Sequence, residues 1–306
     1  SEYMESRGKS NKIIVILGPT SSGKSSIAIK LANKFNGEII SADSRQIYRG
    51  MDLGTGKVSM AEQKMAHHWL IDVVSPKTDF NVTQFKRKTE KIIADILKRK
   101  KLPIICGGTG FWIKAVVDDL NFPKVKPNWE LREKLGKLGS RELFKMLRRI
   151  DPGRASTIDA KNKIRLIRAI EICQKIGRVP RLKPQLSQEK NKFDFLQIGI
   201  DVPRAQLYSK IKKRLEKRFQ SGLIEEVNDL CKLGLSWKKI QGFGLCYFWT
   251  PLYLAGKISL DQLEERVYLA EKDYAKRQMT WFNKDKRIVW LKNYKGVEKE
   301  VKKFLS

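Results

Sequence analysis

Residues 18–25 have the residue types and the spacing of a phosphate-binding loop. Between an apolar run at 13–17 and a helical pattern that starts at 26, they read Gly18-Pro19-Thr20-Ser21-Ser22-Gly23-Lys24-Ser25. The two glycines permit a tight turn that points successive backbone N–H groups into one concavity, and the following helix adds the positive end of its dipole. Lys24 would contact a terminal phosphate, and Ser25 would offer its hydroxyl to Mg²⁺. The segment predicts a polyphosphate ligand without specifying which one.

Two further polar side chains come directly after apolar runs. Asp43 follows the run at 38–42, and Thr109 lies in the sequence Gly-Gly-Thr-Gly that follows the run at 102–106. Asp43 could hold Mg²⁺ as in a kinase or ATPase, accept a proton from the acceptor of a transferase, or cap its loop. Thr109 could bind a phosphate or a leaving-group oxygen, or serve the turn alone. Glycines stand where a Walker-type carboxylate would follow Cys106, and this argues against an ATPase.

The elements that would position these residues alternate between strand and helix. We expect strands near 13–17, 38–42, 69–74, 102–106, 194–201 and 287–291, and a helix at 82–100. This alternation predicts an α/β fold, a P-loop NTPase-like parallel sheet flanked by helices. Ligands of such sheets bind at the carboxyl ends of the strands, so the P-loop, Asp43 and Thr109 should converge on one site.

The pattern changes to helices alone near Pro123. We expect helices at 129–138, at 140–149 with Ser140 as N-cap, and at 163–176, followed by two long basic helices at 204–233 and 259–283. The predicted organisation is a disordered leader at 1–11, a core domain in two parts at 12–122 and 191–306, and an inserted all-helical domain at 123–190.

The composition indicates a polyanionic partner. The formal net charge is +30, with 63 Lys and Arg against 33 Asp and Glu. The four cysteines have no paired spacing, which favours reduced thiols in the cytoplasm over zinc or disulfides. His67 and His68 lack partners at ligand spacing and are interpreted as structural. No apolar run is long enough to cross a membrane, and we expect a monomer.

Taken together, these segments resemble the tRNA dimethylallyltransferases, also called tRNA isopentenyltransferases, over about residues 12–290. The most specific match is the run at 43–55, similar to the family pattern D-S-x-Q-x-Y-x-G-M-D-x-G-T. The P-loop, the Gly-Gly-Thr-Gly turn and the segments at 67–72, 165–171 and 276–282 also resemble family motifs. Gly244 and Asn283 depart from them, since the family usually has Lys or Arg at the first and often Arg at the second. The chain resembles the short bacterial form without a zinc finger.

The resemblance implies transfer of a dimethylallyl group from its diphosphate to the exocyclic amine of the adenosine 3′ of a tRNA anticodon. It implies that the P-loop grips the donor diphosphate with Mg²⁺. The implied catalytic residues are Asp43, Thr109 and Arg214, with Arg218 as the alternative to Arg214. The implied tRNA contacts are Asp43, Ser44, Arg45, Gln46, Thr109, Ile164, Arg165, Leu166, Ile167, Arg168, Lys276, Arg277 and Gln278.

Two other classes of protein share some of these features. A P-loop nucleoside or nucleotide kinase with a helical lid would have the same loop and an inserted domain, but it would act on ATP. A non-catalytic, GTPase-like RNA-binding module would bind nucleotide without transfer. The chain has no N-K-x-D sequence to specify guanine.

Overall fold

The computed structural model describes residues 11–182 and 192–306 of the 306. The chain divides into two compact units, Ser1–Asp118 with Ser187–Ser306, and Asp119–Leu186. The expected leader at 1–11 lies, except for Asn11, outside the described residues, as do residues 183–191 at the expected end of the insertion.

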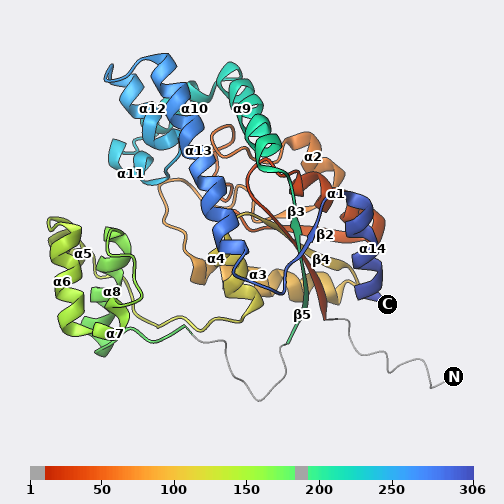
Figure 1. The fold of residues 1–306 in the computed structure, drawn as a ribbon, viewed down its shortest axis with the longest axis horizontal. Helices are drawn as coiled ribbons and strands as arrows, with labels where there is room; N and C mark the ends of the chain where they lie inside the picture. The colour runs from red at the N-terminus through yellow and green to blue at the C-terminus, as the bar shows by residue number, and fades with distance from the viewer. Residues whose placement is uncertain (1–10, 183–191) are drawn as a thin grey trace. The chain divides into compact units, whose positions relative to one another are not determined.

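The larger unit is built on one parallel sheet (Figure 1). Its strands are β1 (Lys12–Leu17), β2 (Gly37–Ser41), β3 (His68–Trp69), β4 (Leu102–Gly107), β5 (Asp194–Ile200) and β6 (Val289–Leu291). The order across the sheet is β3-β2-β4-β1-β5-β6, and every neighbouring pair is parallel. The predicted α/β fold is therefore confirmed, with the strand that precedes the P-loop in the middle of the sheet.

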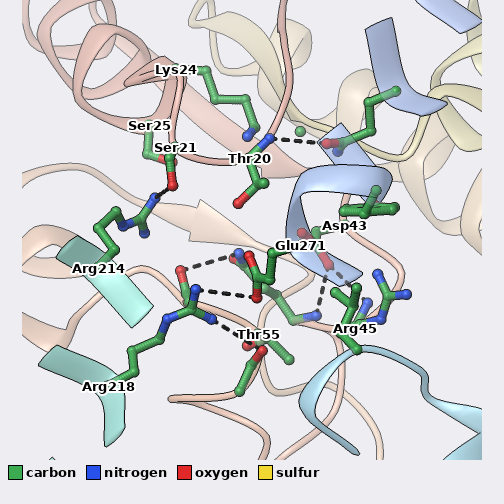
Figure 2. A pocket seen from close by; sticks show the side chains of 17 residues that line it. Thr20, Ser21, Lys24, Ser25, Asp43, Arg45, Thr55, Arg214, Arg218 and Glu271 are labelled. Carbon is green, nitrogen blue, oxygen red and sulfur yellow. Dashed lines mark hydrogen bonds and ion pairs between the residues drawn. The ribbon is translucent and has the colours of Figure 1, made fainter. Parts of the chain in front are cut away.

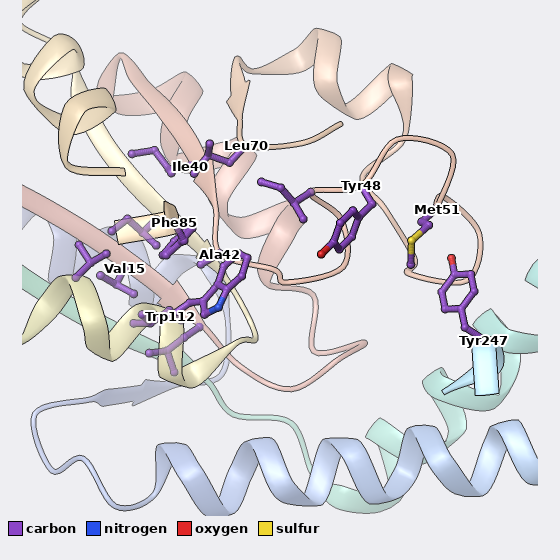
Figure 3. Close-up of a cluster of buried hydrophobic side chains, with 14 of the residues drawn as sticks. Val15, Ile40, Ala42, Tyr48, Met51, Leu70, Phe85, Trp112 and Tyr247 are labelled. Carbon is purple, nitrogen blue, oxygen red and sulfur yellow. The ribbon is translucent and has the colours of Figure 1, made fainter. Parts of the chain in front are cut away.

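Helices cover both faces of this sheet. Residues 13–17 of β1 are therefore buried on both sides, which explains why the run is apolar at every position. Ile14 and Ile16 face one layer, where they pack with α1 (Lys24–Phe35) and α14 (Tyr294–Leu305). Val15, with its neighbours at 13 and 17, faces the other layer, with α3 (Val82–Lys98) and α4 (Gly110–Val117). In that layer the rings of Phe85 and Trp112 stack with centroids 4.5 Å apart (Figure 3). A strand buried on both faces needs apolar residues at every position.

Six further helices complete this unit in its described part. They are α2 (Met60–Met65), α9 (Arg204–Gln220), α10 (Leu223–Lys232), α11 (Trp237–Gly242), α12 (Cys246–Leu254) and α13 (Leu260–Phe282). The long helix α13 packs against α4, α9 and α12, so it connects the sheet layer with the helices that follow β5 (Figure 1).

The smaller unit contains α5 (Trp129–Gly136), α6 (Ser140–Ile150), α7 (Pro152–Ala155) and α8 (Lys163–Ile176) in its described part. It has its own core, which includes Leu143, Leu147 and Leu166. The buried carboxylate of Glu171 accepts hydrogen bonds from Arg132 and from the backbone N–H of Asn128, and it also pairs with Arg168. A buried charge needs such partners to offset the loss of hydration.

Three expectations about elements are wrong in detail. The strand expected at 69–74 ends at Trp69, because Leu70 and Asp72 adopt positive φ values of 64° and 55° that extended chains do not allow. The helix expected at 204–233 is two helices, since Gly222 at φ 106° starts α10. Ser140 is the first residue of α6 and not its N-cap. Gly139 holds that position, and its N–H is accepted by Glu142 at 3.0 Å.

Two expectations drawn from the composition concern the cysteines and the possibility of a membrane-spanning helix. All four cysteines are free thiols, and three of them are buried. Among the helices in the described part of the chain, none combines the length and the apolar character that a membrane crossing requires.

Candidate active site

The carboxyl ends of β1, β2 and β4 meet at one cavity of the larger unit (Figure 2). Its walls come from the P-loop, the loop after β2, a loop at 54–56, and the helices that follow β5. The lining residues are Thr20, Ser21, Lys24, Ser25, Asp43, Arg45, Gln46, Gly54, Thr55, Gly56, Gly107, Arg214, Arg218, Leu245, Glu271, Tyr274 and Gln278. The predicted convergence of P-loop and Asp43 is thus present, and polar groups dominate the wall.

The P-loop has the backbone shape that anion binding requires. Ser21 and Gly23 adopt positive φ values of 63° and 88°, and the N–H of Ser22 donates to the carbonyl of Pro19 at 3.2 Å. Helix α1 starts at Lys24, and its N-cap, Gly23, has no side chain to occupy the amides of the first turn. Lys24 Nζ donates to the Pro19 carbonyl at 3.2 Å, and burial lowers the pKa of this lysine. The loop therefore presents a cation and the uncapped start of a helix to an anion.

Of the two candidate arginines on α9, Arg214 contacts the P-loop. Its Nη1 donates to the hydroxyl of Ser21 at 3.2 Å, and burial lowers its pKa (Figure 2). Arg218 lies one turn later and is engaged inside the protein. Its Nη1 is 3.3 Å from the carbonyl oxygens of Leu53 and Gly54, and its Nη2 pairs with Glu271 at 3.2 Å. Arg214 is therefore the arginine that lies against the P-loop, and Arg218 is the one that pairs with Glu271.

Asp43 is held in a fixed orientation at the end of β2. Its Oδ1 accepts the backbone N–H groups of Arg45 at 2.9 Å and of Gln46 at 3.1 Å. The cap expected as one interpretation is therefore formed, and it uses one carboxylate oxygen, while the side chain still lines the cavity. Thr109 lies beside this loop but outside the cavity lining, and its Oγ1 accepts the N–H of Ser44 at 3.0 Å.

Helix α13 contributes a row of residues that sequence reasoning did not assign to the cavity. Glu271, Tyr274 and Gln278 are spaced i, i+3 and i+7, which places them on one face of the helix. This helical spacing of polar residues is the feature of the sequence that could have identified a polar face of α13. Arg45 lies over the ring of Tyr274 at 4.9 Å and donates from Nε to the carbonyl of Phe243 at 2.7 Å.

Gln278, expected as a tRNA contact, has its amide engaged inside the protein. Its Oε1 accepts the N–H of Thr20 at 3.0 Å, and its Nε2 donates to the carbonyl of Gly108 at 3.1 Å. Only 6% of the residue is exposed. A Cβ at Gly108 would lie 2.3 Å from that Nε2, so only glycine allows this approach. Gln278 thus joins the P-loop to the Gly-Gly-Thr-Gly turn.

The expected tRNA contacts that lie away from the cavity are on helices α13 and α8. Lys276 and Arg277 are exposed on α13 of the larger unit. The stretch 164–168 lies in the first turns of α8 of the smaller unit, where Ile164 is 81% exposed and Leu166 is in the core. Gly244 has a positive φ of 75°, and Asn283 is the C-cap of α13.

The residues around the P-loop could bind Mg²⁺ in the way that is common in phosphate-binding enzymes, with few protein ligands. Among the described residues no three His, Cys, Asp or Glu side chains gather as a metal cage. Mg²⁺ commonly takes only one or two protein oxygens, with substrate phosphates and waters filling its other positions. The Ser25 hydroxyl and the Asp43 carboxylate line the same cavity and could supply those oxygens.

A parallel sheet with a P-loop after its central strand, covered by helices on both faces, defines the class of P-loop-type α/β proteins. A family model described as IPP transferase matches residues 46–285, and the chain belongs to that family. It is 41% identical to the tRNA dimethylallyltransferase of Acetivibrio thermocellus over 92% of this chain and 91% of that protein.

Solved structures agree with this relationship. The tRNA delta(2)-isopentenylpyrophosphate transferase from Staphylococcus epidermidis is 34% identical, with a TM-score of 0.69 over 96% of this chain and 98% of that one. The corresponding protein from Bacillus halodurans is 31% identical, with a TM-score of 0.70 over 96% and 95% of the two chains. A eukaryotic dimethylallyltransferase acting on tRNA, at 24% identity and a TM-score of 0.76, shares the fold. These relatives favour prenyl transfer and not the kinase alternative.

Proposed function

We propose that this enzyme transfers a dimethylallyl group from dimethylallyl diphosphate to the exocyclic amine of the adenosine 3′-adjacent to the anticodon. Its substrates would be tRNAs that read codons beginning with U, and its products N6-(dimethylallyl)adenosine and diphosphate. The observation that carries the proposal is one cavity lined by a P-loop, an arginine and an oriented carboxylate in a member of the IPP transferase family.

The donor end of the cavity would stabilise the leaving diphosphate. The amides at the start of α1, which no side chain caps, lie with the Lys24 ammonium and the Arg214 guanidinium, whose Nη1 is 3.2 Å from Oγ of Ser21. Cationic groups and dipoles fixed where charge develops lower the barrier to departure. Mg²⁺, held through Ser25 and the diphosphate, would neutralise further negative charge.

The acceptor end would position a weak nucleophile. The backbone N–H groups of Arg45 and Gln46 fix the Asp43 carboxylate, which would orient the adenine amine and accept its proton. Thr109 would donate its hydroxyl to the oxygen that joins the allyl carbon to the diphosphate, while its Oγ1 accepts the N–H of Ser44. A neutral aryl amine reacts slowly, so its placement beside the donor must supply much of the rate.

The adenine must leave the stacked anticodon loop to reach such a cavity. We propose that residues 43–46 and Thr109 contact the flipped base. Residues 164–168 of the smaller unit, with Lys276 and Arg277, would contact the anticodon arm. Single-stranded loops are the usual target of specific RNA recognition, and the net charge of +30 suits the phosphate backbone. The helical insertion as a tRNA-binding domain, a cytoplasmic location and a monomeric state stay predictions.

The direct test is incubation with labelled dimethylallyl diphosphate, Mg²⁺ and unmodified tRNA, followed by nucleoside analysis. We expect label in N6-(dimethylallyl)adenosine at the position after the anticodon. A parallel incubation with ATP and small hydroxyl acceptors tests the kinase alternative. Phosphoryl transfer there, with no labelled adenosine in the tRNA, would contradict the proposal.

A further inference from the structure

A glutamate outside the motifs of the sequence analysis holds one wall of the cavity. The carboxylate of Glu226, on α10, accepts three consecutive backbone N–H groups. Oε1 accepts those of Asp52 at 2.8 Å and Leu53 at 2.7 Å, and Oε2 accepts that of Gly54 at 2.9 Å. Oε2 also accepts the hydroxyl of Tyr247, on α12, at 2.9 Å. Successive N–H groups that point to one place form a small anion site, and here the protein's own carboxylate fills it.

The loop that Glu226 holds is part of the wall on the arginine side. Gly54, Thr55 and Gly56 line the cavity. A Cβ built on Gly56 would lie 3.3 Å from Nη2 of Arg214, so the loop backbone passes directly beside that guanidinium. A shift of this backbone would therefore open or close the space that Arg214 occupies beside the P-loop.

A cationic and an aromatic side chain also hold the same loop. Arg218 donates to the carbonyl oxygens of Leu53 and Gly54, while Glu226 accepts the N–H groups, so opposite charges fix opposite polar groups of one turn. The ring of Tyr247 covers Gly54 so closely that a Cβ there would lie 2.4 Å from Cζ. Tyr247 itself is fully buried.

Only a carboxylate satisfies this arrangement. All four groups that meet the side chain of Glu226 are donors, and two carboxylate oxygens have enough acceptor sites for them. A glutamine would offer one acceptor oxygen, and its NH₂ group would face at least one N–H or O–H donor. Hydrogen bonds to a charged acceptor are also stronger than neutral ones.

We propose that Glu226 is a positioning residue for the diphosphate donor. Its carboxylate holds the backbone of residues 52–56, and this backbone fixes the position of the Arg214 guanidinium. This inference rests on the proposed function, because it assigns the donor to the Arg214 side of the cavity. Glu226 does not reach the cavity lining itself, and its effect should appear in donor binding and not in the affinity for tRNA.

The test compares Glu226→Gln and Tyr247→Phe with Glu225→Gln, a change at the exposed neighbouring glutamate on the same helix. We expect Glu226→Gln to raise the KM for dimethylallyl diphosphate at least tenfold, with kcat within about threefold and the Kd for tRNA within about twofold. Tyr247→Phe removes one donor and leaves the three N–H bonds, so its KM should rise two- to threefold. Glu225→Gln should match the wild type.

Binding of inorganic pyrophosphate, measured by calorimetry, gives a readout that needs no turnover. If the wild type binds pyrophosphate but transfers no dimethylallyl group, the proposed function fails while the role of Glu226 is still measured by the change in pyrophosphate Kd. An unchanged donor KM and pyrophosphate Kd in folded Glu226→Gln would overturn the inference. Should that variant not fold, wild-type pyrophosphate binding by Tyr247→Phe would overturn it as well.

Discussion

Replacement of Gln278 by leucine separates a structural role of this side chain from a role in tRNA binding. Leucine fills a similar volume but provides neither an acceptor for the N–H of Thr20 nor a donor for the carbonyl of Gly108. A buried backbone group left without its partner costs about 1–3 kcal/mol. Thr20 is only half-buried and can recover part of that cost from water, so we expect a loss of about 2–4 kcal/mol.

For a chain of this size, that loss would lower the melting temperature by roughly 3–6 °C in a thermal unfolding experiment. The affinity for dimethylallyl diphosphate should fall too, because the P-loop and the Gly-Gly-Thr-Gly turn lose their common support. Lys276→Ala is the matched control on the same helix, since Lys276 is exposed. It should leave the melting temperature unchanged and weaken tRNA binding.

The opposite result for Gln278→Leu would refute this reasoning. If Gln278 serves tRNA directly, the variant should melt with the wild type and show only a higher Kd for tRNA, measured by filter binding. The RNA contact predicted from the sequence would then be supported, and the two internal hydrogen bonds of Gln278 would contribute little to the free energy of unfolding.

Four further outcomes follow from the site and the charge distribution. Asp43→Asn should fold normally and bind donor within threefold, but its single-turnover transfer rate should fall at least about 100-fold, as for loss of a general base. A wild-type rate would remove Asp43 from proton transfer. Lys24→Ala should raise the donor Kd more than about tenfold by losing a charge-assisted contact, with tRNA affinity retained. Equal losses of both affinities would indicate a structural role. Hydrogen bonding from Arg99 holds the pKa of Glu38 at about 2, below its usual 4.5. A group whose pKa is lower when folded stabilises the protein above its unfolded pKa, so Glu38→Gln should be less stable than the wild type at neutral pH. That difference in unfolding free energy should shrink as the pH falls from 4.5 to about 2, and a constant difference would contradict the assignment. Finally, the logarithm of the tRNA association constant should fall steeply with the logarithm of salt concentration, whereas a flat response would mean that the positive charge is not used for RNA.

The sequence predicted the sheet and the P-loop well because both depend on local patterns. The apolar runs of β1, β2, β4 and β5 are bounded by polar turns, and each one reads as a buried strand. Asp43 reached the cavity as predicted, because parallel strands bring their carboxyl ends to one edge. The short helices α2, α4, α11 and α12 were not predicted, since they have too few turns to show a clear period.

The rest of the site depends on long-range contacts that no local pattern records. Glu226 and the loop it binds are about 170 residues apart in the sequence. Gln278 reaches Thr20 across 258 residues, and its type alone fits a surface contact as well as a buried bridge. Arg214 contacts the P-loop whereas Arg218 pairs with Glu271, and helical spacing cannot show where each guanidinium points.

The position of the inserted unit within the chain also has a consequence for synthesis. The P-loop and Asp43 precede the insertion, whereas Arg214, Glu226 and Gln278 all follow it. Translation adds about 5–20 residues per second, so a growing chain carries its P-loop and Thr109 for roughly 10–30 s before Gln278 is made. During that time the P-loop lacks both Arg214 and Gln278, the side chain that joins the P-loop to the Gly-Gly-Thr-Gly turn. A chain that stops before Gln278 would therefore lack part of the cavity wall, because that wall is built from residues on both sides of the insertion.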